Sequence, residues 1–254
     1  MAPRTPLACA LLVGAAACAA PAGGGVADPL EPLNRGVFVF NGVFDLAILR
    51  PLTWVYRRVL PAPVRGAVSN VLHNLLSIDT ILNDVLQGEL AQAGQDFGRF
   101  AVNSTIGVGG LFDVAGRYGV AQHDTDFGET LHRWGAGPGP YLVVPFVGPS
   151  TARDVAGLGV TFATYPIVYV DDTTVQLVTL GLVGVDRRAR VPPKAEQMVR
   201  DSHDRYAFVR DAWYQNRRFH LEGEEADSES SEELEDLLDE LDELEATGDV
   251  DEDP

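Results

Sequence analysis

Few residues of this chain combine the type and the spacing that catalysis requires. No Gly-x-Ser-x-Gly nucleophile turn and no His-Glu-x-x-His zinc motif occurs. The glycines at 107–110 follow a helical pattern and lack the Gly-Lys-Ser/Thr end of a phosphate-binding loop. The histidines share no i, i+3 or i+4 spacing with one another: His73, His123, His132, His203 and His220. We therefore expect no enzyme activity, no cofactor and no metal site, although a Ser, His and Asp brought together only by folding would leave no motif.

The two cysteines lie at the start of the chain, in a segment that resembles the signal peptide of an exported protein. Cys9 and Cys18 are the only ones, so the remaining sequence forms no disulfide. Arg4 precedes an apolar run over 7–17 that is too short to cross the ~30 Å hydrocarbon core of a bilayer as a helix. Residues 1–17 are therefore predicted to be a signal peptide.

The residues before Cys18 resemble a bacterial lipobox, after which the cysteine becomes the acylated N-terminus, for example carrying palmitate. We predict Cys18 as the lipid anchor and residues 18–27, rich in Ala and Gly, as its tether. Ala19 after the cysteine resembles the outer-membrane sorting pattern. Ordinary secretion stays open, because Ala15-x-Ala17 also fits a signal-peptidase site.

The charge of the chain is concentrated in its last residues. The net charge is −18, and 18 of the 37 acidic residues lie in 222–254, a segment without Lys or Arg. The other 19 acids balance the 19 bases in residues 1–221. A neutral body with an acidic tail excludes nucleic acid as a partner, since nucleic acid binding needs a basic surface.

The body of the chain reads as apolar helices. Residues 36–49 contain only two polar residues, Asn41 and Asp45, which share one helical stripe with Asn34. Arg50-Pro51 is expected to end this helix. Further helical patterns cover 71–76, 82–86 and 92–106, and Gln87-Gly88 is expected to end the second of them. Residues 155–170 form an uncharged segment interrupted by Pro166. That last segment suits an interfacial or re-entrant position or, alternatively, a buried helix and strand. None of these apolar segments is expected to span a membrane.

Glycines and prolines at 135–140 interrupt the helical pattern. The β-prone residues 141–145 follow them, so a loop or short β-hairpin is expected near 135–147. A helix over 202–218 presents Arg210, Arg217 and Arg218 on one side, where they are candidates for contact with anionic headgroups or simply form a solvated face. The tail 222–254 is either disordered or an amphipathic leucine-bearing helix.

Several motifs occur in the order found in the VacJ/MlaA family of bacterial outer-membrane phospholipid-transport lipoproteins, which the sequence resembles over about 28–220. They are Asp28-Pro29-Leu30-Glu31 with Asn34-Arg35, Arg99-Phe100 with Asn103-Ser104, Gly107-x-Gly109-Gly110-Leu111-Phe112-Asp113, Asp126-Phe127-Gly128 with Trp134-Gly135, Gly139-Pro140-Tyr141, Gly148-Pro149-Ser150, and Tyr206 with Arg210. Departures from the pattern are Leu33, Ala15 in the lipobox, Arg205 before Tyr206, and the acidic tail.

The resemblance implies a mainly α fold, with a ring of amphipathic helices parallel to the plane of the outer membrane around an amphipathic channel. It implies trimeric porins and a soluble periplasmic lipid carrier as partners, and phospholipid as the cargo. On this basis residues 28–221 form the helical domain. Candidates for channel or lipid contact are Asn41, Asp45, Gly135, Gly137, Gly139 and Tyr141.

The predicted function is a phospholipid conduit on the periplasmic face of the outer membrane of a Gram-negative bacterium. It would remove misplaced phospholipid from the outer leaflet and so maintain lipid asymmetry. The alternative is a porin-associated adaptor that moves no lipid and recruits partners through its acidic tail.

Overall fold

The structure is a computed structural model that describes residues 28–221. The predicted signal peptide, Cys18, the tether and the acidic tail lie outside the described residues. The chain divides into two compact units, residues 1–206 and 207–254, which are described separately. The described part of the first unit is mainly helical, with one two-stranded antiparallel sheet, which confirms the predicted fold class.

The first unit opens with one continuous helical segment. Helix α2 (Glu31–Phe44) runs directly into a π-helical turn, η2 (Asp45–Leu49), and then into α3 (Arg50–Val59). The expectation that Arg50-Pro51 ends the helix is wrong. Pro51 stands in the first turn of α3, where its missing N–H is not needed, and the wider π-turn bonds the Arg50 N–H to the Asp45 carbonyl.

By length and composition this segment is sufficient to cross a membrane, in contrast to the prediction. Residues Glu31–Val59 make 29 residues with a mean hydropathy of 1.3 in the best window, of which only 6% is buried. The correction follows from the π-turn, which joins two shorter apolar stretches into one helix.

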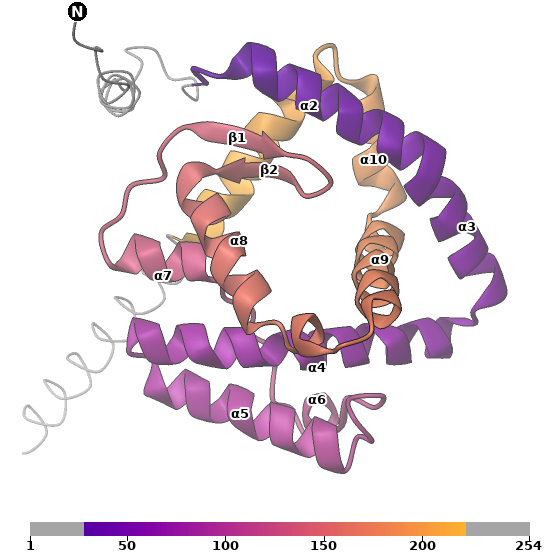
Figure 1. Cartoon of the computed structure of the whole chain (residues 1–254), viewed down its shortest axis with the longest axis vertical. Coiled ribbons are helices and arrows are strands. Elements are labelled where there is room, and N and C mark those ends of the chain that lie inside the picture. The colour runs from indigo at the N-terminus through magenta and orange to yellow at the C-terminus, as the bar shows by residue number, and fades with distance from the viewer. Residues whose placement is uncertain (1–27, 222–254) are drawn as a thin grey trace, which may run out of the picture. The chain divides into compact units, whose positions relative to one another are not determined.

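Helix α4 (Ala62–Gln87) runs across the lower half of Figure 1. The sequence pattern indicates two pieces, but the helix continues through Asp79, whose carboxylate accepts hydrogen bonds from α8 instead of capping a new helix. It ends as predicted at Gly88, which takes the left-handed conformation with φ +86°. Helix α5 (Leu90–Thr105) then packs antiparallel along it.

The remaining elements complete a circuit around a central space (Figure 1). In chain order they are α6 (Val114–Arg117), α7 (Phe127–Arg133), β1 (Tyr141–Val144), β2 (Gly148–Thr151), α8 (Ala152–Thr164), the 3₁₀ turn η3 (Pro166–Tyr169), α9 (Thr173–Arg190) and α10 (Pro193–Asp201). The uncharged segment 155–170 is thus a helix followed by a turn, and the alternative of a strand there is wrong because Pro166 starts a 3₁₀ turn. How these helices lie relative to a membrane stays a prediction.

The hairpin exists but lies later in the chain than 135–147. Tyr141 pairs with Thr151 and Val144 with Gly148, so the second strand is Gly-Pro-Ser-Thr. Proline is tolerated there because a two-stranded sheet has only edge strands, where an absent N–H breaks no central ladder.

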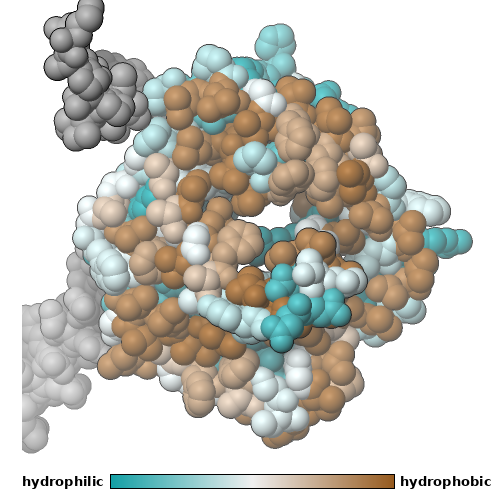
Figure 2. All heavy atoms as spheres, in the orientation of Figure 1, coloured by the Kyte–Doolittle hydropathy of each residue, from teal (hydrophilic) through white to brown (hydrophobic). Residues whose placement is uncertain are grey.

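The distribution of polarity is inverted relative to a water-soluble domain. Among the described residues, the fully buried set contains sixteen polar or charged residues and ten hydrophobic ones. Large apolar side chains instead face outward along α2, η2 and α3, including Leu33, Val43, Leu46 and Trp54, each at least 60% exposed. Brown apolar atoms therefore cover much of the face shown in Figure 2. An apolar exterior of this extent indicates a lipid or protein environment.

Asn34 holds the hairpin to α2. Its side chain is 1% exposed; Nδ2 donates to the Tyr141 carbonyl at 3.0 Å, and Oδ1 accepts from the Val143 N–H at 2.9 Å. We expect Asn34→Ala to lower the free energy of unfolding by about 2–4 kcal/mol, since it strands two buried backbone groups. Thermal unfolding in detergent measures this.

Asn41→Ala is the matched control for that experiment. Asn41 makes the same pair of bonds, with the Val144 carbonyl and the Phe146 N–H, but at the exposed turn of the hairpin. Water replaces its bonds, so we expect a loss of about 1 kcal/mol or less. Equal losses in the two variants would contradict the role given to Asn34.

Candidate functional site

A cavity of about 430 Å³ lies inside the first unit. This volume falls in the range of about 300–1,000 Å³ that is typical of ligand sites. Four parts of the chain line it, namely α4, the segment 124–126, α8 and α9. Figure 2 shows a central opening in this face, bordered by both teal and brown side chains.

The walls of the cavity are of two chemical kinds. Leu72, Leu76, Leu158 and Val183 supply apolar surface, and the ionisable groups are His73, Asp79, Asp124, Asp126, Asp186, Arg187 and Arg190. The cavity therefore offers ionic groups and hydrocarbon within one space, which suits an amphipathic molecule better than a purely polar or purely apolar one.

Asp186 connects three helices at the wall of the cavity. Its side chain is 5% exposed and accepts hydrogen bonds from Tyr56 of α3 at 2.9 Å, Ser69 of α4 at 3.0 Å, and Arg190 of α9 at 3.0 Å. Burial, together with this carboxylate, raises the pKa of Tyr56 to about 12. Tyr56 is therefore a neutral donor at any physiological pH.

His73 and Asp79 fix the α4 side of the cavity. Burial and the neighbouring Arg190 lower the pKa of His73, so its neutral ring accepts a hydrogen bond from Arg190 at 3.1 Å. Asp79 accepts from Thr161 at 2.9 Å and Thr164 at 2.6 Å, which ties α4 to α8. The sequence does not reveal these wall residues, because the partners that join Asp79, His73 and Asp186 to other helices are between 82 and 130 residues away.

The predicted stripe on the first helix faces inward but does not line the cavity. Asn41 binds the backbone of the hairpin turn. Asp45 pairs with Arg188 of α9 at 2.6 Å and with Arg50 at 2.9 Å. Neither residue is among those around the 430 Å³ cavity, so the described contacts are structural, and lipid contact at these positions stays a proposal.

The glycines at 135–139 have different local roles. Gly135, with φ +86°, ends α7 in a Schellman motif, in which the Ala136 N–H bonds to the Leu131 carbonyl. Gly139 has φ +67°, and a Cβ there would lie 3.0 Å from the Cβ of Ala152. Gly137 has neither constraint. A tight turn therefore explains Gly135 and Gly139, whereas the structure gives no reason for a glycine at position 137.

Tyr141 is placed away from any surface. It is 1% exposed, and its ring meets the edge of Tyr206 at 6.3 Å between centroids. Lipid contact would require this packing to open, so the described contacts of Tyr141 are those of a core residue, and lipid contact at this position stays a proposal.

The predicted headgroup-binding arginines lie in the second unit. Residues 207–221 are helical there, as expected, and Arg210 donates to Asp211 at 2.9 Å. Contact of Arg210, Arg217 and Arg218 with headgroups stays a prediction.

One cluster of possible metal ligands occurs among the described residues, whereas the sequence predicts no metal site. Asp84, Asp96 and His123 each offer a ligand atom, and these atoms lie within 4.8 Å of one another. The three residues come from α4, α5 and the segment before α7, so no short sequence motif contains them.

Fold and cavity together define a class: a mainly helical protein with an apolar exterior and a cavity whose wall is partly ionic. Within that class, the family model described as MlaA lipoprotein matches residues 26–220. The chain belongs to the MlaA lipoprotein family, as the ordered motifs indicate.

Relatives and a solved structure agree with this assignment. The chain is 35% identical over 205 residues to the intermembrane phospholipid transport system lipoprotein MlaA of Escherichia coli, covering 79% of this chain and 81% of the relative. It is 37% identical over 193 residues to an uncharacterised protein of Rickettsia conorii, covering 76% and 77%. A solved structure concerned with maintenance of bacterial outer membrane lipid asymmetry is similar with a TM-score of 0.66 and 35% identity, covering 76% of this chain and 98% of the solved one.

Proposed function

We propose that this chain is an outer-membrane lipoprotein that conducts phospholipid through the cavity between α4, α8 and α9. A phospholipid that moves between leaflets needs a path that solvates its headgroup while its tails stay in apolar surroundings. The observation that carries the proposal is the cavity wall, where Arg187, Arg190 and Asp186 lie beside Leu158 and Val183.

We further propose a path for the lipid and a position for the protein. Misplaced phospholipid leaves the outer leaflet, enters the cavity and passes to a soluble periplasmic carrier, with a trimeric porin holding the protein in place. The outward apolar side chains of α2 and α3 support a position within the membrane or against a partner. Cys18 would anchor the chain to the bilayer.

The test is the amount of phospholipid exposed at the cell surface. We expect it to rise in a strain that lacks this protein and to return to normal when the gene is restored. No rise on deletion would contradict the proposal. Removing residues 222–254 separates the conduit from the adaptor, because a conduit keeps its transport and an adaptor loses its partner.

We also predict that the segment 135–139 acts as a gate for the transported phospholipid. We expect Gly137→Val to raise surface phospholipid toward the level of the deletion strain, with membrane attachment intact, because a β-branched residue restricts the backbone. Gly137 is the informative position, since a Cβ there meets nothing within 4 Å and its φ lies outside the left-handed region. Unchanged lipid asymmetry in this variant would leave the segment as a turn only.

A further inference from the structure

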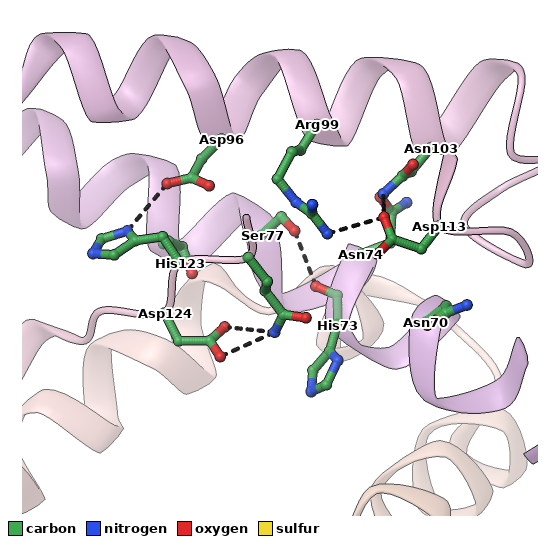
Figure 3. A pocket seen from close by; sticks show the side chains of 12 residues that line it. Asn70, His73, Asn74, Ser77, Asp96, Arg99, Asn103, Asp113, His123 and Asp124 are labelled. Carbon is green, nitrogen blue, oxygen red and sulfur yellow. Dashed lines mark hydrogen bonds and ion pairs between the residues drawn. The ribbon is translucent and has the colours of Figure 1, made fainter. Parts of the chain in front are cut away.

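Three residues from separate parts of the first unit meet beside a small polar pocket. Asp84 comes from α4, Asp96 from α5 and His123 from the segment between α6 and α7. His123 Nδ1 lies 3.1 Å from Asp96 Oδ2 and 3.5 Å from Asp84 Oδ1. Figure 3 shows the side chains of Asp96 and His123 pointing toward one another.

Asp84 is the unusual member of this group. It is 0% exposed, and within the described part of the chain neither carboxylate oxygen has a hydrogen-bond partner. A buried carboxylate that accepts no hydrogen bond is costly unless a proton or a cation neutralises it. Asp96, in contrast, accepts a hydrogen bond from Gln92 at 2.9 Å.

We propose that Asp84, Asp96 and His123 together bind one divalent transition-metal cation, with Zn²⁺ as the best fit. Nitrogen and oxygen ligands about 2.0–2.2 Å from Zn²⁺ stand roughly 3.4 Å apart in a tetrahedron. The two measured separations from His123 Nδ1, 3.1 and 3.5 Å, match that spacing. A binding site therefore needs only a small approach of the two carboxylates, whose ligand atoms lie within 4.8 Å.

The one imidazole and two carboxylates of the cluster favour some cations over others. An imidazole nitrogen suits zinc and its transition-metal neighbours, whereas Mg²⁺ and Ca²⁺ prefer sites made only of oxygen. Two carboxylates and a neutral histidine carry a charge that a divalent ion cancels. Three protein ligands leave the fourth tetrahedral position to a water molecule.

The competing occupant is a proton shared between the carboxyl groups. Burial raises the pKa of Asp84 to about 7, with the nearby charge of Asp96 adding to this effect. Burial also opposes ionisation of Asp96, but hydrogen bonds from His123 and Gln92 outweigh it and keep its pKa below the ordinary value. Asp96 is thus ionised and ready to bind a cation. At Asp84, a cation has to displace the proton that the raised pKa favours.

The pocket in Figure 3 supplies an entry path. Its volume of about 30 Å³ is lined by Asp96, His123, Gln122 and Asp124, among other polar residues. That space holds a water molecule or two, and the His123 side chain is 23% exposed. Bound there, the ion would fasten α4, α5 and the segment before α7 to one another, as a structural metal does.

The experiment uses the full chain in detergent, stripped with EDTA and transferred to metal-free buffer. We expect titration with Zn²⁺ to give one equivalent bound, and Zn²⁺ at a hundredfold excess over its dissociation constant to raise Tm by about 5–10 °C. Mg²⁺ at the same concentration should produce no rise. Asp84→Asn and His123→Gln should each weaken Zn²⁺ binding at least about 100-fold and abolish the rise in Tm.

Asp113→Asn is the matched control, because Asp113 lines the same pocket but stands apart from the cluster, and it should bind Zn²⁺ normally. Circular dichroism shows whether each variant folds. Co²⁺ bound to the unaltered chain gives a further readout, the visible absorption of a tetrahedral site. The proposal is overturned if the unaltered chain binds no equivalent of Zn²⁺ or lacks the tetrahedral Co²⁺ spectrum. It is also overturned if a folded Asp84→Asn variant keeps the rise in Tm, because Zn²⁺ then stabilises the chain without the Asp84 carboxylate.

Discussion

Cells that carry Val183→Trp are expected to show as much surface phospholipid as cells that lack the protein. Val183 lies on α9 and contributes apolar wall to the 430 Å³ cavity. An indole there occupies space that the lipid needs, while the membrane anchor and the outer apolar side chains stay unchanged. Lipid exposed at the cell surface is the measurement, with the amount of membrane-bound protein recorded alongside it.

Leu177→Trp is the control for this experiment. Leu177 belongs to the same helix but is 65% exposed and does not line the cavity. It therefore adds the same indole to α9 without narrowing the path, and transport should continue. Normal lipid asymmetry in the Val183→Trp strain would exclude this cavity as the route, even if the protein transports lipid elsewhere.

A large loss of stability is expected for Asp186→Ala. This change leaves the buried Tyr56 hydroxyl and Ser69 without their acceptor. The Arg190 side chain is 43% exposed, so water screens its ion pair and it contributes little. The buried bond to Tyr56 and the part-buried bond to Ser69 therefore account for most of the loss, about 2–4 kcal/mol, and Tm falls by roughly 4–16 °C.

Two further variants separate the parts of this effect. Tyr56→Phe removes one bond, and we expect it to cost about 1 kcal/mol, while Asp186→Asn keeps the shape and an acceptor and falls between the two. The double variant Tyr56→Phe/Asp186→Ala should lose less than the sum of the single losses, because both changes remove the same contact. Strict additivity would show that Asp186 does not join α3 to α9 in the folded protein.

Sequence patterns predict those parts of the fold that depend only on neighbouring residues, such as a helix end at a glycine or the polar face of one helix. The left-handed Gly88 ends α4 as expected, and the stripe of Asn34, Asn41 and Asp45 does face long-range partners. Pro51 was misread because the rule that proline ends a helix takes no account of a preceding π-turn, which depends on packing around it. The second strand was missed because Gly-Pro-Ser-Thr has little β-propensity and forms only by pairing with β1.

Local sequence patterns cannot predict the cavity wall or the cluster of metal-ligand candidates, because their residues are far apart in the sequence. Asp186 and Tyr56 are 130 residues apart, and His123 joins Asp84 and Asp96 only because α4 and α5 run side by side. Isolated histidines and aspartates in a sequence carry no sign of one another. Their grouping is a property of the tertiary structure, so only coordinates reveal it.

The outward apolar side chains of α2, η2 and α3 have a thermodynamic consequence. Amphiphiles that cover these side chains bind the folded chain more than the unfolded one, and such linkage adds a free energy that grows with amphiphile concentration. We expect the unfolding temperature of the purified protein to rise with the concentration and chain length of the surrounding surfactant. The stability of the folded chain would then depend both on its own contacts and on the amphiphiles that cover these side chains.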